Sequence, residues 1–194
     1  MGHKFDPSRK ELLDSPDRRE WQNPQAILEA FEVMKGMVVA DVGCGTGFFS
    51  IPAAGMVGTR GRVYAVDVQE EMLWSLQERL LKEGVGNVLP VLSLEDVIPL
   101  PSGSVDMVLL VNTLHELAGD ATILEISRIL RTEGHAAVVD WKKEPMEMGP
   151  PLEHRLSLSD ANDRLTARGF KVKEVQVGPL HYGIKAARTG DLGH

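Results

Sequence analysis

From residue 38 onward, short apolar runs alternate with longer segments in which apolar residues recur every three or four positions. The short runs are rich in β-branched residues and predict strands, and the longer segments predict helices. Several of the runs are apolar at consecutive positions, which is typical of strands that helices cover on both faces. The strands are expected at residues 38–42, 62–67, 87–92, 105–111 and 135–141.

Capping residues and glycines mark the ends of the expected helices. Asn23 and Pro24 open the first, and a second covers about 69–83 before Gly84. The other two expected N-caps are Asp120 and Ser159, and the other closing glycines are Gly36, Gly134 and Gly169. The apolar positions expected to face inward on the first and third helices are Ile27, Leu28, Phe31, Met34, Ile123, Ile126 and Leu130.

After Gly169 the chain reads FKVKEVQV and then HYGIKAA, with Gly178 and Pro179 between the two runs. Two strands joined by so short a connection form an antiparallel hairpin. The expected fold is therefore α/β and doubly wound, with a mostly parallel seven-stranded sheet that ends in a C-terminal antiparallel hairpin. A chain of 194 residues is long enough for one substantial core, so residues 1–194 are expected to form a single domain.

Composition narrows the possible partners. The net charge is -7, which disfavours binding to a phosphate backbone, so we expect no nucleic-acid partner. Cys44 is the only cysteine, which excludes an internal disulfide and fits a reducing, cytoplasmic setting. No run approaches the roughly 20 apolar residues of a membrane span, and the histidines lack the spacing of metal ligands. Neither a membrane association nor a metal site is expected.

The strongest chemical signal is VVADVGCGTGFF at residues 38–49, where a buried strand breaks into Gly43, Gly45 and Gly47 before a helix. Closely spaced glycines let the backbone turn sharply and approach a ligand at the carboxyl edge of the sheet. A dinucleotide-binding loop places its third glycine three residues after the second, whereas here the spacing is two. The pattern favours a nucleoside-containing ligand and disfavours a nicotinamide-dependent oxidoreductase.

Asp67 ends the second expected strand, twenty residues after Gly47. At this place an acidic side chain lies beside the glycine loop and can accept hydrogen bonds from both hydroxyls of a ribose. The alternative is that Asp67 only caps the following helix. Its distance from the glycine loop favours the ribose role.

Three segments together resemble the class I S-adenosylmethionine-dependent methyltransferases, most nearly those of quinone biosynthesis: DVGCGTGFF, VDVQEEML and PLPSGSVDMVLLVNTLHEL. The resemblance implies a Rossmann-like fold, S-adenosylmethionine as cofactor and methyl transfer to a small molecule. It implies that Asp41 orients the ammonium group of the cofactor and that Asp67 holds the ribose. The loop residues Gly43, Cys44, Gly45 and Gly47, and Val68 beside Asp67, complete this part of the expected cofactor site.

One position departs from the family pattern. Where the family has an acid that meets the adenine amino group, this chain has Leu94, followed by Glu95 and Asp96. Either acid is a candidate for the adenine contact, and both could equally be exposed loop residues. Asn112, after the fourth expected strand, matches a position whose backbone lines the cofactor pocket, although its side chain could instead cap the next turn.

If the methyl acceptor must lose a proton, a base has to lie beside the transferred methyl group. His115 and Asp140 follow the fourth and fifth expected strands on the edge that faces the cofactor, and either could serve. His115 could also be a packed structural residue. Asp140 could instead bond a turn at the end of its strand.

Two segments are expected to form the acceptor side of the site. These are residues 1–22, in which His3, Phe5 and Trp21 could cover the pocket, and the loop at 142–158. A non-catalytic module that binds S-adenosylmethionine is the alternative to an enzyme, because it would need Asp41, Gly45 and Asp67 but no base. The identity of the acceptor and the oligomeric state stay open, with a homodimer one option.

Overall fold

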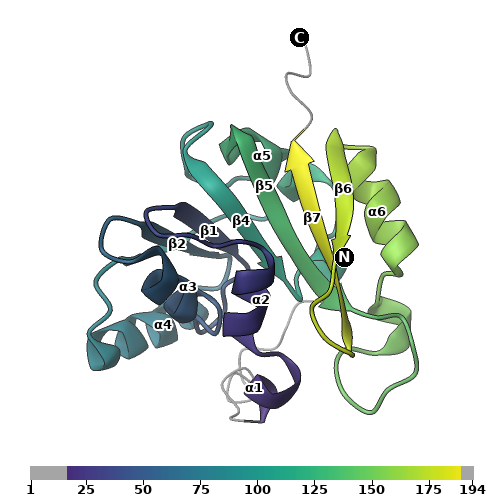
Figure 1. Cartoon of the computed structure of the whole chain (residues 1–194), viewed down its shortest axis with the longest axis horizontal. Helices are drawn as coiled ribbons and strands as arrows, with labels where there is room; N and C mark the ends of the chain where they lie inside the picture. The colour runs from purple at the N-terminus through teal and green to yellow at the C-terminus, as the bar shows by residue number, and fades with distance from the viewer. Residues whose placement is uncertain (1–16, 189–194) are drawn as a thin grey trace.

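The computed structural model describes residues 17–188, in which seven strands form one sheet in the order β3-β2-β1-β4-β5-β7-β6 (Figure 1). Strands β1 to β5 run parallel, and β7 lies antiparallel to both β5 and β6. The fold predicted from the sequence is confirmed, including the reversed last strand. The strands are β1 Val38–Val42, β2 Arg62–Asp67, β3 Val88–Leu92, β4 Val105–Val111, β5 Leu130–Trp141, β6 Phe170–Val175 and β7 His181–Arg188.

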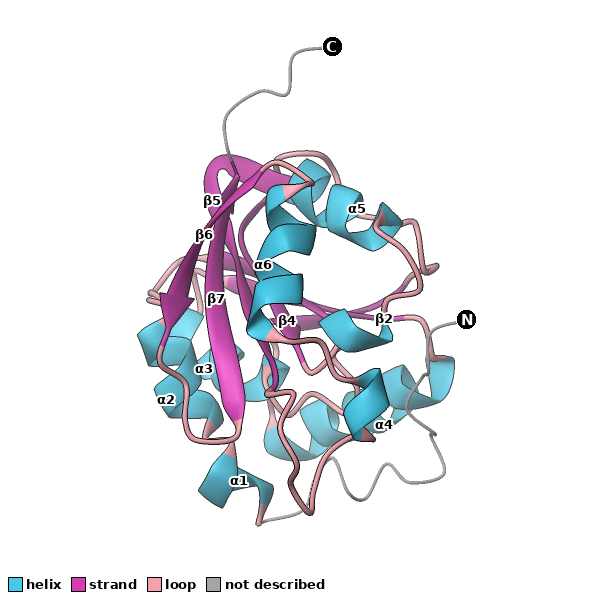
Figure 2. Ribbon diagram, turned by 90° about the vertical axis from the view of Figure 1, so that its right-hand side faces the viewer, coloured by secondary structure: helices cyan, strands magenta, loops and turns pink. Residues whose placement is uncertain are grey.

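Helices cover both faces of the sheet (Figure 2). Helices α2, α3 and α4 pack against one face, and α5 and α6 pack against the other. Neighbouring residues of a central strand therefore face different cores, as Val39 and Ala40 of β1 do, and both are fully buried. This explains the consecutive apolar positions in the sequence. The helices are α1 Arg18–Trp21, α2 Pro24–Ala30, α3 Ser50–Val57, α4 Glu70–Glu83, α5 Ala121–Ile129 and α6 Leu158–Thr166.

The first predicted helix is shorter than expected. Helix α2 ends at Ala30, and Glu32 has a φ of 63°, a left-handed conformation that stops the helix before Gly36. Ile27, Leu28 and Phe31 are buried as predicted. The prediction for Met34 was wrong, because the chain has left the helix there and 59% of the residue is exposed.

The boundary between α5 and β5 also differs from the prediction. Leu130 was expected in the helix and Gly134 at its end, but both lie in β5, which begins at Leu130. Leu130 is fully buried, and burial alone does not distinguish a helix from a strand. Asp120 occupies the N-cap position of α5 without a capping hydrogen bond, because its carboxylate pairs with Arg164 and Arg168.

Ser157 caps α6, and the prediction of Ser159 was wrong. The hydroxyl of Ser157 accepts from the backbone N–H of Asp160, and the Asp160 side chain accepts from the backbone N–H of Ser157. This reciprocal arrangement is a capping box, which satisfies two backbone donors at the start of the helix. Helix α4 agrees with its prediction and ends at Gly84, which has a φ of 68°.

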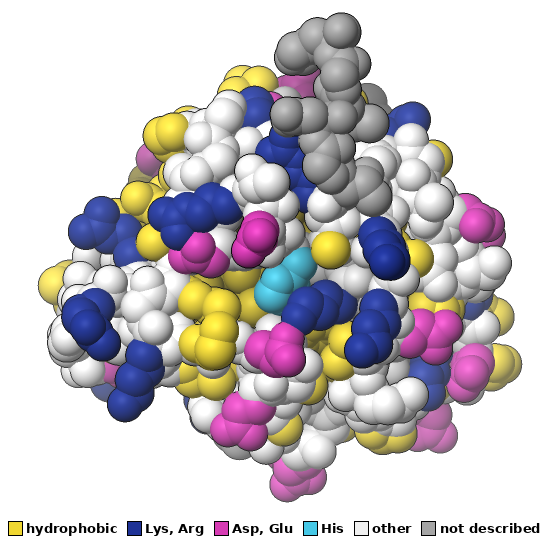
Figure 3. All heavy atoms as spheres, turned by 45° about the horizontal axis from the view of Figure 1, so that its top comes forward, with side chains coloured by type: hydrophobic (Ala, Val, Ile, Leu, Met, Phe, Trp, Pro, Cys, Tyr) yellow, Lys and Arg dark blue, Asp and Glu magenta, His cyan; other side chains and the backbone are white. Residues whose placement is uncertain are grey.

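The predicted site residues lie at the carboxyl ends of the parallel strands and not at the amino ends. At the amino ends, Figure 3 shows Lys and Arg side chains beside Asp and Glu side chains. One ion pair of this edge joins Arg131, at the start of β5, to Asp106 in β4. The loops at the carboxyl ends of the strands contain the predicted site residues instead, so the site lies at the opposite edge. Within residues 17–188, no helix is long and apolar enough to cross a membrane.

Candidate active site

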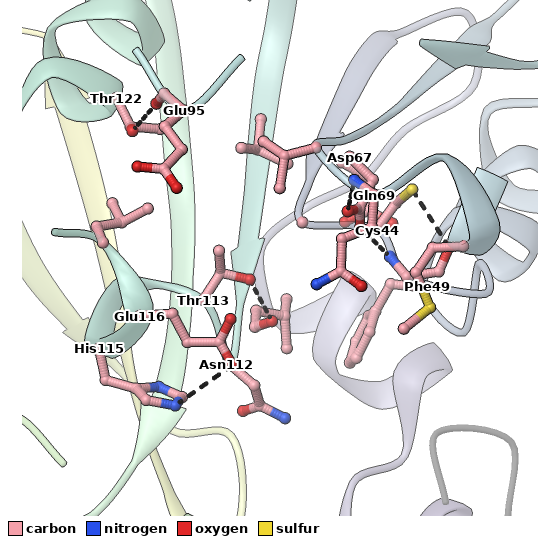
Figure 4. A pocket seen from close by; sticks show the side chains of 18 of the residues that line it. Cys44, Phe49, Asp67, Gln69, Glu95, Asn112, Thr113, His115, Glu116 and Thr122 are labelled. Carbon is pink, nitrogen blue, oxygen red and sulfur yellow. Dashed lines mark hydrogen bonds and ion pairs between the residues drawn. The ribbon is translucent and has the colours of Figure 1, made fainter. Parts of the chain in front are cut away.

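A pocket of about 680 Å³ lies at the carboxyl ends of the parallel strands (Figure 4). This volume falls within the range of about 300–1,000 Å³ that is common for small-molecule sites. In Figure 4, Asp67, Gln69 and Cys44 lie on one side of the cavity, and Glu95 and His115 lie on the other. The predicted site residues that line the pocket are Asp41, Gly43, Cys44, Gly45, Asp67, Val68, Glu95, Asp96, Asn112 and His115.

Two predicted site residues, Gly47 and Asp140, do not line the pocket. Gly47 has a φ of 87°, and a Cβ there would collide with the Leu76 side chain of α4, so this glycine allows close packing of the loop on the helix. Asp140 is 1% exposed and lies behind His115. Of the predicted acceptor-side residues, Trp21 lines the pocket, whereas His3 and Phe5 lie outside the described residues.

The glycine loop turns tightly over the ends of β1 and β2. The backbone N–H groups of Gly43 and Cys44 both donate to the Val66 carbonyl, at 2.8 and 3.1 Å. Gly43 has a φ of 75°, and a Cβ on it would lie 2.5 Å from the Thr113 hydroxyl oxygen. Only glycine fits there, so the loop backbone itself forms the pocket wall.

Asp67 connects the glycine loop to α4. One carboxylate oxygen accepts from the Gly45 N–H at 2.8 Å, and the other accepts from the Gln69 N–H at 3.0 Å. Gln69 itself occupies the N-cap position of α4, so Asp67 does not cap the helix but joins the glycine loop to the residue at the start of the helix. A carboxylate can accept several hydrogen bonds, and Asp67 also lines the pocket, where hydroxyl groups of a ligand can reach it.

Asp41 is a buried acid next to the loop. The hydroxyl of Ser50, at the start of α3, donates to its carboxylate at 2.5 Å. The pKa of Asp41 is raised from its ordinary 3.8 to about 6, mainly because the group is buried; the nearby charge of Asp67 contributes to the rise, and the Ser50 hydrogen bond opposes it. A buried carboxylate of this kind is stabilised by a cation.

Cys44 is 7% exposed, as expected of a small buried residue in the loop. Burial, with the charges of Asp41 and Asp67, raises the pKa of its thiol well above the usual value. A thiol kept protonated in this way is a poor nucleophile. The side chain therefore serves as packing in the pocket wall.

Glu95 and Asp96 lie in the loop that follows β3. Both are exposed and both line the pocket. The Glu95 carbonyl accepts from the Thr122 hydroxyl of α5 at 2.5 Å, which ties this loop to the helix. Both acids are thus near the cavity, and the choice between them for an adenine contact stays a prediction.

Asn112 has a φ of 55°, which is uncommon for a residue other than glycine. Its side-chain amide exchanges hydrogen bonds with that of Gln22, at 3.1 and 3.3 Å, rather than capping the following turn. Gln22 is fully buried directly after α1. The pair therefore joins the N-terminal helix to the end of β4 at the pocket.

His115 and Asp140, predicted as separate candidates, form one hydrogen-bonded pair. Nδ1 of His115 lies 2.7 Å from an Asp140 carboxylate oxygen, and the backbone N–H of His115 donates to the other oxygen at 3.0 Å. The Trp141 N–H also donates to Asp140, at 2.8 Å. With Nδ1 bonded to the buried acid, His115 Nε2 is the ring nitrogen left for pocket chemistry, 3.9 Å from a Glu116 carboxylate oxygen.

Opposing effects act on the protonation of His115. Burial of the ring lowers its pKa, but the hydrogen bond and charge of Asp140, together with the charge of Glu116, raise it more. The net result is a pKa above the ordinary 6.5. His115 is therefore a stronger base than a free imidazole, which is the property that a proton acceptor needs.

Several pocket residues were not predicted from the sequence. Arg18 of α1 is 8% exposed, and its guanidinium lies 4.0 Å from the centre of the Phe48 ring. Nothing in the local sequence around Arg18 indicates this, because the contact joins two distant segments. Gln69 and Met72 could have been found, since they begin the helix that follows Asp67. The other lining residues not predicted include Thr46, Phe49, Ile98, Thr113, Glu116 and Thr122.

Four arginine side chains hold the loops around the pocket by donating hydrogen bonds to the backbone carbonyl groups of these loops. Arg79 of α4 donates to the Thr46 carbonyl. Arg128 of α5 donates to two carbonyl groups in the loop before β4, and Arg164 of α6 donates to three carbonyl groups in the loop after β4. Arg155 does the same for the loop after β5. The accepting residues of Arg128 and Arg164 are Ile98, Leu100, Leu114, Leu117 and Gly119.

Comparisons with known proteins show which family the chain belongs to. A family model described as a methyltransferase domain matches residues 39–134. A crystal structure of an S-adenosylmethionine-dependent methyltransferase from Aquifex aeolicus is 40% identical, with a TM-score of 0.91, and the match covers 94% of this chain and 98% of that one. The chain belongs to the S-adenosylmethionine-dependent methyltransferases. The resemblance inferred from the three motifs is thereby confirmed, and S-adenosylmethionine is the cofactor.

Curated relatives of this methyltransferase are named for quinone biosynthesis. The ubiquinone/menaquinone biosynthesis C-methyltransferase UbiE of Neisseria meningitidis is 35% identical over 163 residues, which are 81% of this chain and 64% of the relative. The demethylmenaquinone methyltransferase of Geobacillus kaustophilus is 30% identical over 118 residues, 60% of this chain and 50% of the relative. The chain thus spans between half and two thirds of these two proteins.

Proposed function

We propose that this methyltransferase transfers the methyl group of S-adenosylmethionine to a small-molecule acceptor and uses His115, held by Asp140, as the base. The observation that carries the proposal is the hydrogen bond between the buried Asp140 and His115, which lines the same pocket as the glycine loop. A module that only binds the cofactor needs no such base. In this proposal residues 1–194 act as one domain.

The arrangement of the pocket fits the cofactor. We assign the ammonium group to Asp41, whose buried carboxylate gains from a cation, and the ribose hydroxyls to Asp67. The backbone of the glycine loop and Val68 would lie against the ligand, with Asn112 at the opposite wall. Glu95 or Asp96 would meet the adenine amino group. The positive charge of Arg18, close to Asp41, suits the carboxylate of the same amino-acid group.

The protein itself is expected to contribute little covalent chemistry. The cofactor supplies a methyl group on a positive sulfur, which is already a good leaving group, so the protein mainly has to orient the two reactants and exclude water. His115 Nε2 would take the proton of the acceptor as the acceptor atom bonds to the methyl carbon and the bond from this carbon to sulfur breaks. Asp140 would keep the proton of the ring on Nδ1 and stabilise the imidazolium that results.

Two features favour a small acceptor with an aromatic or other apolar body. Trp21 and Trp141 line the pocket with ring centres 5.3 Å apart, and planar groups pack well against such rings. The relatives named for quinone biosynthesis point to the same class of acceptor. The net charge of -7 argues against a nucleic acid.

Calorimetric titration followed by turnover assays tests the proposal. The protein is expected to bind S-adenosylmethionine and its demethylated product but not NAD. A panel of phenols, quinols, thiols and amines with labelled cofactor then identifies the acceptor. Absence of S-adenosylmethionine binding would contradict the assignment of the cofactor groups to Asp41 and Asp67. Equal turnover by the wild type and His115→Gln on the acceptor so found would remove the base from the mechanism.

A further inference from the structure

The loop between β5 and α6 forms one wall of the pocket with few hydrogen bonds to the rest of the protein. Within the part of the chain that the structure describes, the backbone of residues 143–150 takes part in hydrogen bonds through three carbonyl groups only. All three accept from the single side chain of Arg155. The accepting residues are Glu144, Met148 and Pro150, and the loop residues that line the pocket are Met148, Gly149, Pro150 and Pro151.

Arg155 is buried, with 4% of the residue exposed. Its Nε donates to the Pro150 carbonyl at 2.8 Å and its Nη2 to the Met148 carbonyl at 2.8 Å. Nη1 donates to the carbonyls of Glu144 and Lys142, at 3.0 and 3.3 Å. In residues 17–188 no ion pair joins Arg155 to a carboxylate, so these carbonyl groups are what compensates the buried charge.

The loop held in this way lies directly on Trp141. Gly149 has a φ of 89°, and a Cβ on it would lie 2.8 Å from the Trp141 ring. The Arg155 guanidinium is 5.8 Å from the centre of that ring. Trp141 follows Asp140, and its N–H donates to the carboxylate that also holds His115. The loop therefore packs on the side chain of Trp141, and the backbone of the same residue bonds the carboxylate that holds His115.

We propose that Arg155 is a positioning residue, which fixes the loop at 143–150 against Trp141 and so gives the acceptor wall of the pocket its shape before the acceptor binds. The assignment of this wall to the acceptor rests on the proposed function. A planar guanidinium can donate to several carbonyls in fixed directions, whereas a lysine ammonium donates from a single point. The position of the loop is therefore expected to need arginine and not only a positive charge.

Limited proteolysis tests the proposal without an assay of enzyme activity. Trypsin cleaves after Lys142 and Lys143, which lie where the loop leaves β5. In the native protein, Arg155→Met is expected to be cleaved there at least about tenfold faster than the wild type, because access requires local opening of the chain. Arg155→Lys is expected to fall between the two, and it gives the same comparison if Arg155→Met does not fold. Arg131→Met, which removes an arginine at the opposite edge of the sheet, is the matched control.

Kinetics separate a positioning role from a general loss of structure. In Arg155→Met, the KM for the acceptor is expected to rise at least about tenfold, with kcat reduced less and the Kd for S-adenosylmethionine within about twofold of wild type. Equal cleavage rates in the wild type and both Arg155 variants, or an unchanged acceptor KM in Arg155→Met, overturns the proposal. If the wild type binds no S-adenosylmethionine, the proposed function fails while the cleavage rates still report on the loop.

Discussion

Replacement of Asp41 by asparagine is expected to stabilise the ligand-free protein while weakening cofactor binding. The amide keeps an oxygen for the Ser50 hydroxyl but has no charge to bury. Each pKa unit corresponds to about 1.36 kcal/mol, so the rise from 3.8 to about 6 represents about 3 kcal/mol of destabilisation above pH 6. The variant is expected to recover up to this amount, because the change removes the ionised group.

The pH dependence follows from proton linkage. The unfolded chain releases the Asp41 proton near pH 4, whereas the folded protein retains it until about pH 6. Between these values the folded state binds more protons, so the stability of the wild type falls as the pH rises through this window. The advantage of Asp41→Asn is therefore expected to be absent below pH 4, to grow from pH 4 to 6 and to stay constant above it.

Thermal unfolding without ligand measures this effect. For a chain of this size, about 3 kcal/mol corresponds to an increase in Tm of about 6–12 °C at pH 7.5. Glu78→Gln, a neutralisation of an exposed acid on α4, is the control and is expected to change stability by at most about 0.5 kcal/mol. An Asp41→Asn protein no more stable than wild type at pH 7.5, or equally stabilised at pH 4, would refute the reasoning. In calorimetry the same variant is expected to bind S-adenosylmethionine more weakly, since the cation loses its partner.

Four further predictions concern the base, its partner Asp140, the ribose ligand and the glycine loop. His115→Gln is expected to lower kcat by about 100- to 10,000-fold with the cofactor Kd within about twofold, as steady-state kinetics and calorimetry would show. In the wild type, kcat/KM is expected to rise with pH through an apparent pKa above 6.5, and Asp140→Asn is expected to move that midpoint lower, because the main group that favours the protonated ring is removed. A midpoint that does not move would contradict the pairing. Asp67→Ala is expected to abolish measurable cofactor binding, and Gly43→Ala to lower the free energy of unfolding by about 1–3 kcal/mol in urea denaturation, since its φ of 75° disfavours any side chain.

The parallel strands were predictable because burial on both faces leaves a local signature. Strand β4 is one example, in which Leu109 and Leu110 face different cores and are both 1% exposed. The end of α4 was equally predictable, because Gly84 adopts the left-handed conformation that closes a helix. The prediction failed where a helix and a strand have the same local pattern, as at Leu130, which could be buried in either element. The capping box of Ser157 and Asp160 did have a signal, a serine three residues before an acid.

The site was predictable as a set of residues but not as a set of contacts. The glycine loop and Asp67 follow consecutive strands, so their proximity follows from the order of the strands. The pairing of His115 with Asp140 depends on where two loops meet after β4 and β5, which the spacing of 25 residues does not determine. Arg18 lies in a short helix whose position depends on the link between Gln22 and Asn112, and no sequence pattern describes such a link.

The four arginines that hold the pocket loops bond to backbone carbonyls, which every amino acid has. A substitution in one of these loops therefore changes the surface presented to an acceptor without removing the bonds that hold the loop in place. Binding preferences can diverge among descendants of this protein through the side chains of residues 143–151, while the scaffold and the cofactor half stay constant. An engineer who seeks a new acceptor has the same freedom, provided that Arg155 is retained.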